Sequence, residues 1–328
     1  IFVAMKKNVA VLVGGYSSEY EISMKSGQVV YNNLDKDLYN AFRIVVTKDK
    51  WFYLDNNNKE FNISKNDFSL TIENKKIKFD VAFIVIHGSP GEDGVLQSYF
   101  KSIGIPYSGC DSDTSAITFN KRDCISILKK YGIPTANSIH LNYGDKIEEE
   151  KIIKEIGIPC FVKANKSGSS FGVYKVNKKS ELSPSINNSF KIDKEILIES
   201  FLDGTEVSVG VMNYKKNIKV FGITELVTEN DFFDYEAKYE GKSKEITPAN
   251  ISKIQKNNVT KIAKKIYQKL GVKGLSRSEF IFVGNTPYFL ELNSIPGLTK
   301  ESIFPKQVKI NGISLKELFT DIVKQAIE

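Results

Sequence analysis

The chain has 328 residues, of which 41% are hydrophobic and 26% are charged, a composition typical of a globular protein with two or three domains. Its formal net charge of +7 would suit a nucleic-acid-binding protein. The lysines, however, are spread among acidic residues, without a long basic block or an RNA-binding aromatic motif. No apolar stretch approaches a membrane span, and the N-terminus lacks a signal-peptide pattern. We therefore expect no nucleic acid and no membrane among the partners.

The three cysteines indicate a reducing compartment. Cys110, Cys124 and Cys160 have neither the spacing of a metal site nor the density of a disulfide framework. Such a sparse, odd set is typical of a cytoplasmic protein, and Cys160 falls in a strand pattern that predicts a core position.

The first elements predict an α/β unit. Residues 8–13 form an apolar strand pattern that ends at Gly14-Gly15, and a helical pattern follows as far as Asn33. A dinucleotide-binding fingerprint would need a third glycine, so that interpretation is weak. Glu21 lies at the start of the helix, just past the carboxyl end of the strand, where open α/β sheets bind ligands. A plain first-turn carboxylate is the alternative, and taken alone it is the commoner one.

A second buried strand pattern, residues 81–86, precedes a loop that has the composition of a site. The loop, HGSPGEDG, begins with His87 and contains three glycines and two acidic residues. A helix is predicted from Gly94 to Ser102, and another from Lys121 to Tyr131.

Two further strand patterns, CFVK at 160–163 and VYKV at 173–176, flank a loop rich in glycine and serine. Its small residues can present successive backbone N–H groups to an anion. The loop is not a P-loop, because its lysine, Lys163, precedes it on the strand. A flexible linker is the alternative, although linkers rarely lie between two strands.

Residues 195–200 predict a strand, and residues 205–212 and 218–224 predict a hairpin. From Val227 to Pro248 the chain is polar and aromatic; its length and Lys238 indicate a lid over a site. An amphipathic helix follows over 251–270, with Ile254, Ile262, Ile266 and Leu270 on one stripe, and a last helix begins at Ser314.

A hairpin of residues 275–283 and 288–292 carries the most specific charge pattern. If Val283 pairs with Pro287, Glu279 lies opposite Glu291 on one face. Arg277 would then lie opposite Asn293 on that face. Opposed carboxylates repel, but Mg²⁺ binds carboxylate and amide oxygens and would remove the repulsion. From the hairpin alone, a magnesium site and an ordinary charged face remain equally open.

The motifs as a set resemble those of a known family. In chain order they are GGYSSEYEIS, HGSPGEDG, Lys121, VKANKSGSSFG, IES with Glu206, FFDYEAKY, SRSEF and LELNSIPGLTKESI. These resemble the motifs of the ATP-grasp ligases and, within them, of the D-alanine–D-alanine ligases, over essentially Lys6 to Glu328. The resemblance implies an α/β (α+β) ATP-grasp fold: an N-terminal doubly wound α/β domain (5–110), a central domain (111–198) and a C-terminal domain (199–328), the last two clasping ATP.

The resemblance also implies a nucleotide site. Its phosphate-binding residues would be Lys121, Lys163, Lys238 on the lid, and Ser170 in a closing flap of residues 167–172. Glu199 and Leu202 would meet the adenine, and Glu206 the ribose. Glu279, Glu291 and Asn293 would bind Mg²⁺, or Mn²⁺, as two ions. Glu279 departs from the family pattern, which usually has aspartate there, and this could alter the metal preference.

Two D-alanine molecules would be the substrates, joined through an acyl phosphate in a cytoplasmic homodimer. Glu21 would pair with the first ammonium group and with Ser169 and Tyr239, and His87 would lie beside that substrate. Arg277 and the N–H of Gly297 would stabilise the oxyanion. Ser302 and Ile303 would receive the second carboxylate. Each role is carried over from the family to the matching residue.

Three alternatives remain. Within the fold, the chain would make D-alanyl-D-lactate or join another carboxylate to an amine. Tyr239 argues against the ester, because its hydroxyl stays neutral up to a pH of about 10 and does not repel an ammonium group. From another class, a catalytically silent nucleotide-binding protein would have no need for Arg277 and the clustered carboxylates.

Overall fold

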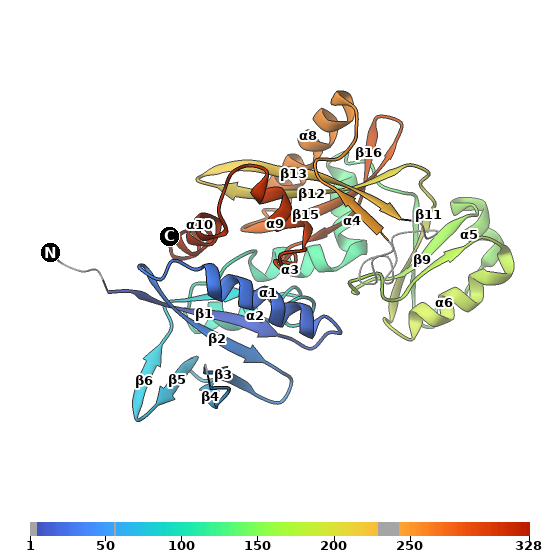
Figure 1. The fold of residues 1–328 in the computed structure, drawn as a ribbon. Coiled ribbons are helices and arrows are strands. Elements are labelled where there is room, and N and C mark those ends of the chain that lie inside the picture. Colours follow the sequence, from blue (N-terminus) through green and yellow to red (C-terminus); the bar gives the residue numbers. More distant parts are fainter. Residues whose placement is uncertain (1–4, 56, 229–242) are drawn as a thin grey trace.

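The computed structural model describes residues 5–55, 57–228 and 243–328 and contains three β-sheets (Figure 1). The first sheet has the order β6-β5-β4-β3-β2-β1-β7. Its strands are β1 (Lys7–Gly14), β2 (Tyr39–Val46), β3 (Trp51–Leu54), β4 (Glu60–Ser64), β5 (Ser69–Ile72), β6 (Lys75–Lys78) and β7 (Val81–Ile84). β1 runs parallel to both β2 and β7, and the remaining pairs are antiparallel. The predicted opening strand and the strand before the His87 loop are therefore neighbours.

Helices cover both faces of the parallel part of this sheet, which explains the unbroken apolar run in β1. Helix α1 (Tyr20–Asn33) packs on one face and α2 (Val95–Ser102) on the other. On the α2 side, Phe68 and Phe100 pack edge to face with ring centroids 4.9 Å apart.

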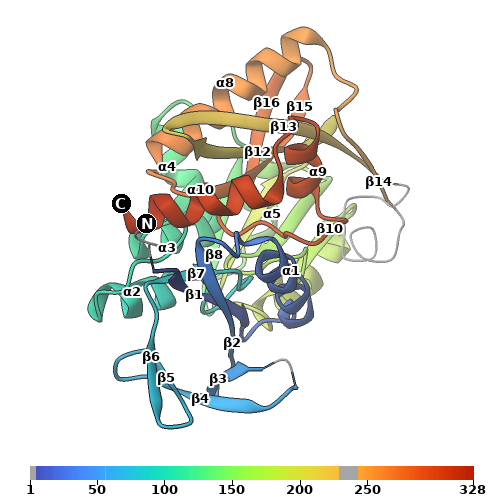
Figure 2. The same ribbon diagram turned by 60° about the vertical axis from the view of Figure 1, so that its left-hand side comes forward.

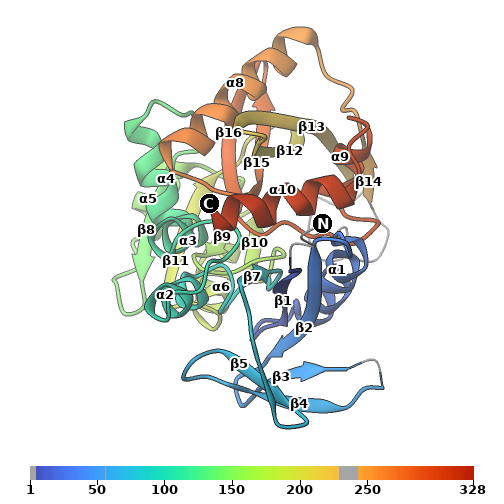
Figure 3. The same ribbon diagram turned by 90° about the vertical axis from the view of Figure 1, so that its left-hand side faces the viewer.

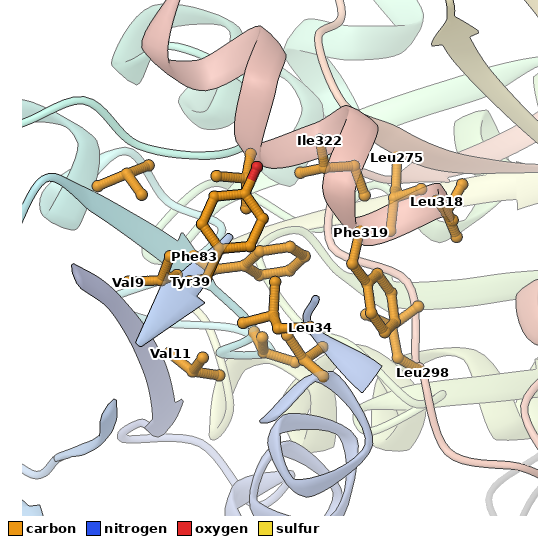
Figure 4. Packing of buried hydrophobic residues seen from close by; sticks show 14 of the residues in the cluster. Val9, Val11, Leu34, Tyr39, Phe83, Leu275, Leu298, Leu318, Phe319 and Ile322 are labelled. Atoms are coloured by element: carbon orange, nitrogen blue, oxygen red, sulfur yellow. The ribbon is translucent and has the colours of Figure 1, made fainter. Parts of the chain in front are cut away.

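The α1 face of the sheet is continuous with the C-terminal part of the chain. Helix α10 (Leu315–Ile327) packs onto it, and the Phe83 and Phe319 rings meet edge to face with centroids 5.7 Å apart (Figure 4). The same cluster contains Leu275 and Leu298. The end of β7, where the His87 loop begins, is thus held close to the segment that follows the predicted hairpin.

The second sheet is antiparallel, with the order β10-β9-β11-β8. Its strands are β8 (Ser138–Asn142), β9 (Cys160–Ala164), β10 (Val173–Val176) and β11 (Glu195–Ser200). Helices α5 (Glu149–Ile156) and α6 (Leu182–Phe190), with the short 3₁₀ turn η1 (Lys179–Glu181), cover one face, where Cys160 is buried. Alternation along β9 and β11 turns Lys163 and Glu199 to the opposite face.

The third sheet is also antiparallel, with the order β14-β13-β12-β15-β16. Its strands are β12 (Thr205–Tyr214), β13 (Asn217–Thr228), β14 (Ser243–Ile246), β15 (Leu275–Val283) and β16 (Thr286–Asn293). Helices α3 (Ser112–Phe119), α4 (Lys121–Lys130) and α8 (Lys253–Lys269) pack on one side, and α9 (Ile303–Lys309) packs on the other. Figures 2 and 3 show α8 above this sheet and α10 below it, next to the first sheet.

In the hairpin β15–β16 the charged residues pair as predicted, but the register at the turn differs from the prediction. Val283 pairs with Thr286 and not with Pro287, so the register near the turn differs by one residue. A bulge between Glu279 and Phe280 restores it, and Glu279 lies opposite Glu291 with Arg277 opposite Asn293.

The buried face of helix α8 differs from the prediction. The predicted stripe on α8 is wrong at Ile254, which is 59% exposed, because the buried face begins only at Val259.

The domain bounds stay a prediction. Cys124 and Leu128 of α4 join the core of the third sheet rather than that of the second. None of the helices in the described residues has both the length and the apolar composition that a membrane span requires.

Candidate functional site

Two adjoining cavities contain most of the predicted site residues that the structure describes. The first has a volume of about 400 Å³ and lies between the polar faces of the second and third sheets. Charged groups in its wall are Lys121, Lys163, Glu199, Asp203, Glu206, Glu225, Glu279 and Glu291. Apolar groups, among them Phe161, Leu202 and Leu290, form the rest of the wall. A flat apolar ring would fit against the apolar groups, and Lys121 and Lys163 would attract an anionic group joined to it.

The ion pair of Lys163 and Glu199 lies in the wall of the first cavity. The Nζ atom of Lys163 is 2.7 Å from Oε2 of Glu199, and both side chains are largely buried. Burial by itself lowers the pKa of the Lys163 ammonium, but the Glu199 carboxylate, with Glu291 and Glu206, outweighs it and holds the pKa above its ordinary value. Lys163 is therefore a permanent cation facing the cavity.

Lys121, at the start of α4, connects the glycine-rich loop to the hairpin. Its Nζ donates a hydrogen bond of 2.6 Å to the carbonyl of Ser167 and lies 3.3 Å from Oε2 of Glu291. In the same loop, Ser169 and Ser170 both adopt a positive φ, which is uncommon for residues other than glycine. Lysine and loop together form one side of the cavity, as an anion-binding flap requires.

The three predicted metal ligands lie on one face of the hairpin. Among the described residues no group of three or more His, Cys, Asp or Glu side chains is placed to hold a metal ion. Glu279 pairs instead with Arg277 at 3.1 Å, and Glu291 with Lys121. Asn293 has a buried amide nitrogen without a hydrogen-bond partner in the part of the chain described. Two opposed carboxylates and an amide are nevertheless a suitable donor set for a hard divalent cation.

The second cavity, of about 530 Å³, adjoins the first and shares Glu291 with it. Its polar wall comes from distant parts of the chain, mainly from loops and the ends of elements. The groups are Glu19, Lys25, His87, Glu92, Ser169, Glu245, Arg277, Asn293, Thr299, Lys300, Glu301 and Ser302.

The structure corrects the prediction for Glu21. Oγ of Ser169 donates a hydrogen bond of 2.6 Å to Oε1 of Glu19, the contact expected for Glu21. Glu21 lies in the first turn of α1 with an exposed side chain, whereas Glu19 immediately precedes the helix and faces the cavity. Two residues correspond to about 200° around a helix, so the two carboxylates point in opposite directions.

His87 is buried in the wall of the second cavity. Its Nδ1 lies 2.9 Å from the carbonyl of Ile295, an atom that can only accept, so Nδ1 carries the proton. Burial lowers the pKa of His87, against the opposing effect of the Glu19 carboxylate. The ring is therefore neutral near pH 7 and its Nε2 is a bare acceptor, with no partner among the described residues.

Glu92 also holds Ile295, although we assigned it no role from the sequence. Its carboxylate accepts hydrogen bonds from the N–H groups of Gly88 (2.7 Å) and Ile295 (3.3 Å). Burial, with Glu19 nearby, raises the pKa of Glu92 to about 8. His87 and Glu92 together fasten the loop after β16 to the loop after β7.

Gly297 and Ser302 are adjacent in the second cavity. A Cβ atom on Gly297 would come within 2.9 Å of Oγ of Ser302, so the close approach requires glycine. Oγ of Ser302 lies 2.8 Å from Oγ1 of Thr299, and Ile303 begins α9. The backbone of this turn and the Ser302 hydroxyl thus face the same space.

Some of the remaining predicted residues line the first cavity, and others lie outside the described residues. Ser170, Leu202 and Glu206 line the first cavity. Lys238, Tyr239 and most of the predicted lid lie outside the described residues. The structure describes only the two ends of that segment, residues 227–228 at the end of β13 and residues 243–248, which include β14. Glu19, Glu92 and Glu245 had not been assigned; for the first two, the signal was the acidic residue within a motif already noted.

The fold and the site define a class, the ligases with an ATP-grasp fold. The structure aligns with D-alanyl-alanine synthetase A from Vibrio cholerae with a TM-score of 0.88, at 28% identity over 99% of each chain. It aligns with D-alanine–D-alanine ligase from Bacillus anthracis complexed with ATP with a TM-score of 0.78, at 26% identity, over 98% of this chain and 97% of that chain.

The sequence comparisons are more specific. Family models described as D-ala D-ala ligase N-terminus and C-terminus match residues 8–110 and 127–324. D-alanine–D-alanine ligase of Flavobacterium johnsoniae is 59% identical over 321 residues, which cover 98% of this chain and 99% of that protein. The chain belongs to the D-alanine–D-alanine ligase family.

Proposed function

We propose that the two cavities carry out the two halves of an ATP-dependent ligation of D-alanine to D-alanine, a cytoplasmic step in peptidoglycan precursor synthesis. Membership of the family supports the overall reaction. The observation that supports the division of labour is the position of Glu291, which lines both cavities and pairs with Lys121. A terminal phosphate in the first cavity would meet an amino acid in the second at this residue.

The first cavity would hold ATP. Phe161, Leu202 and Leu290 supply apolar surface for the base, and Glu199 and Glu206 accept hydrogen bonds from the adenine and ribose. Lys121 and Lys163 neutralise phosphate charge, and the backbone around Ser170 closes over it. Lys238 would add a further cation.

Glu279, Glu291 and Asn293 would hold Mg²⁺ as two ions, with Mn²⁺ as an alternative. Bound there, the metal supplies charge neutralisation for the transferred phosphoryl group. Arg277 and Lys121 pair with the two carboxylates in this structure, and a bound metal would replace them as the partner of Glu279 and Glu291.

The second cavity would bind the first D-alanine. Glu19, not Glu21, receives the ammonium group of this substrate, and the hydrogen bond from Ser169 holds the Glu19 carboxylate in place. We expect Tyr239 to be the third residue of this group. Neutral His87 offers Nε2 as an acceptor beside this substrate. The substrate carboxylate, held towards Glu291, attacks the γ-phosphoryl group of ATP and gives an acyl phosphate and ADP.

The second step forms the peptide bond. The carboxylate of a second D-alanine binds at Ser302 and the backbone of Ile303, and its amine attacks the acyl phosphate. Arg277 and the N–H of Gly297 stabilise the tetrahedral oxyanion, each worth about 3 kcal/mol, and phosphate then leaves. Exclusion of water matters because it would hydrolyse the acyl phosphate.

An assay of ADP release tests the proposal. D-alanine should support turnover, whereas L-alanine and D-lactate as sole substrates should not. With D-alanine and D-lactate together at about pH 6 to 9, D-alanyl-D-alanine should be the main product, as Tyr239 predicts. Ester as the main product would favour the D-lactate alternative. Sedimentation analysis tests the expected homodimer.

A further inference from the structure

Among the described residues, two polar connections link helix α9 to the third sheet, and both reach the segment around β14. α9 begins directly after Ser302, so its position determines where Ser302 and Ile303 face the second cavity. This inference rests on the proposed function, in which those two residues receive the carboxylate of the second D-alanine.

The first connection is an ion pair beside the second cavity. Nζ of Lys306 on α9 is 3.1 Å from Oε2 of Glu245 on β14. The Glu245 side chain is 24% exposed and lines the cavity together with Ser302 and Ile303, whereas Lys306 is not part of the wall. Glu301 lies farther from Nζ, at 3.8 Å, and its side chain is 90% exposed.

The second connection is buried and neutral. Nε2 of Gln307 donates hydrogen bonds of 3.0 Å to the carbonyl of Ser208 and to Oγ1 of Thr224. Oγ1 of Thr224 is in turn 2.7 Å from Oγ1 of Thr247, just past β14. Gln307 is fully buried, and a Cβ atom on Gly210 would come within 2.2 Å of its Oε1. This network holds α9 on the sheet without any help from Lys306.

The charge of Glu245 makes the ion pair matter for substrate binding. A carboxylate that enters the cavity to reach Ser302 would meet the Glu245 carboxylate in the same wall. Like charges in a confined site repel strongly unless a counter-ion is present. Lys306 is that counter-ion, and it also fixes the direction in which Glu245 points.

We propose that Lys306 is a positioning residue for the second D-alanine, acting through Glu245, and that this ion pair makes the subsite accept a carboxylate. Lys306→Met should raise KM for the second D-alanine about tenfold, because the unpaired Glu245 repels the substrate. KM for ATP and for the first D-alanine should stay within about twofold of the parent, since Glu19, Ser169 and His87, to which we assign the first D-alanine, make the hydrogen bonds described above with other residues.

The double variant Glu245→Gln/Lys306→Met separates this electrostatic role from a structural one. With both charges removed, KM for the second D-alanine should return to within about threefold of the parent value. Lys306→Arg should keep KM for the second D-alanine close to the parent value, because arginine preserves the positive charge. Lys309→Met, which removes an exposed cation from the same helix outside the cavity wall, is the matched control and should leave KM for the second D-alanine unchanged.

Thermal unfolding of each variant checks that α9 remains in place, as the Gln307 network predicts. An unchanged KM for the second D-alanine in Lys306→Met would overturn the proposal, and so would a double variant as impaired as the single one. Ser302→Ala tests the subsite separately from the role of Lys306. If this variant leaves KM for the second D-alanine unchanged, the assignment of Ser302 to the second D-alanine is wrong. Absence of D-alanine-dependent ADP release in the parent protein would instead refute the proposed function.

Discussion

The two cavities differ in how the chain builds them. The first takes its charged groups largely from alternating positions on paired strands, such as Lys163 on β9 with Glu199 on β11 and Glu279 on β15 opposite Glu291 on β16. The second takes its groups mainly from residues where elements begin or end: Glu19 before α1, His87 after β7 and the turn before α9.

This difference gives the two cavities different mechanical properties. Strand positions are held by the hydrogen bonds of the sheets, so the first cavity keeps its shape through backbone pairing. The second depends on side-chain contacts between distant loops, such as those of His87 and Glu92 with Ile295. Substitutions in the first cavity should therefore alter the local charge. Substitutions in the second cavity should alter how its loops are positioned relative to one another.

The largest effect is expected at Glu291, the residue common to both cavities. Glu291→Gln should lower kcat by about a thousandfold, because it removes a metal ligand worth several kcal/mol of charge stabilisation. The backbone pairing of β16 does not involve the side chain, so circular dichroism should show an unchanged fold. Near-normal turnover at ordinary Mg²⁺ concentrations would contradict the metal assignment.

The next largest effect is expected at the buried ion pair of the first cavity. Glu199→Gln leaves the ammonium of Lys163 buried without its nearest carboxylate, and should lower the free energy of unfolding by about 3 kcal/mol. Urea denaturation measures this loss. The exposed pair of Lys178 and Glu181 provides a control, because Glu181→Gln should cost at most about 1 kcal/mol. Equal losses in both variants would mean that burial is not the cause.

Glu19 and Glu21 offer a matched pair in the second cavity. Glu19→Gln should raise KM for the first D-alanine by about ten- to a hundredfold, because a hydrogen bond to a charged group is worth about 1.5–3 kcal/mol. Glu21→Gln removes the same charge from an exposed position and should leave that KM unchanged. The reverse result would restore the role that the sequence predicted for Glu21.

The last comparison concerns the pH dependence of stability through Glu92. Its pKa is raised from 4.5 to about 8, so the folded protein favours the protonated form. The resulting stabilisation is complete below the unfolded pKa and is lost as the pH rises through about 8. Glu92→Gln, which cannot ionise, should flatten the fall in unfolding free energy between about pH 5 and 9. Parallel pH profiles for the two proteins would disprove this.

The strand-borne part of the site followed from the sequence because alternation along a strand is local. The face that Glu279 and Glu291 share could be inferred from residue spacing within one hairpin. Even there the turn register was wrong by one residue, and only the bulge beside Phe280 brings the charged residues into line. The sequence pattern carries no separate signal for such a bulge.

The loop-borne part required the tertiary structure. Glu19 and Glu21 are equivalent by sequence pattern; the glycine-rich loop, some 150 residues away, selects Glu19 by placing Ser169 against it. The contacts of Glu92 with Ile295 and of Lys306 with Glu245 likewise join segments far apart in the chain. The sequence by itself determined the family, the order of most of the elements and the shared face of Glu279 and Glu291, because these depend on local periodicity and motif content. Which loop carboxylate faces the second cavity was decided by packing between segments far apart in the chain, because a side chain in a loop has no period that fixes its direction.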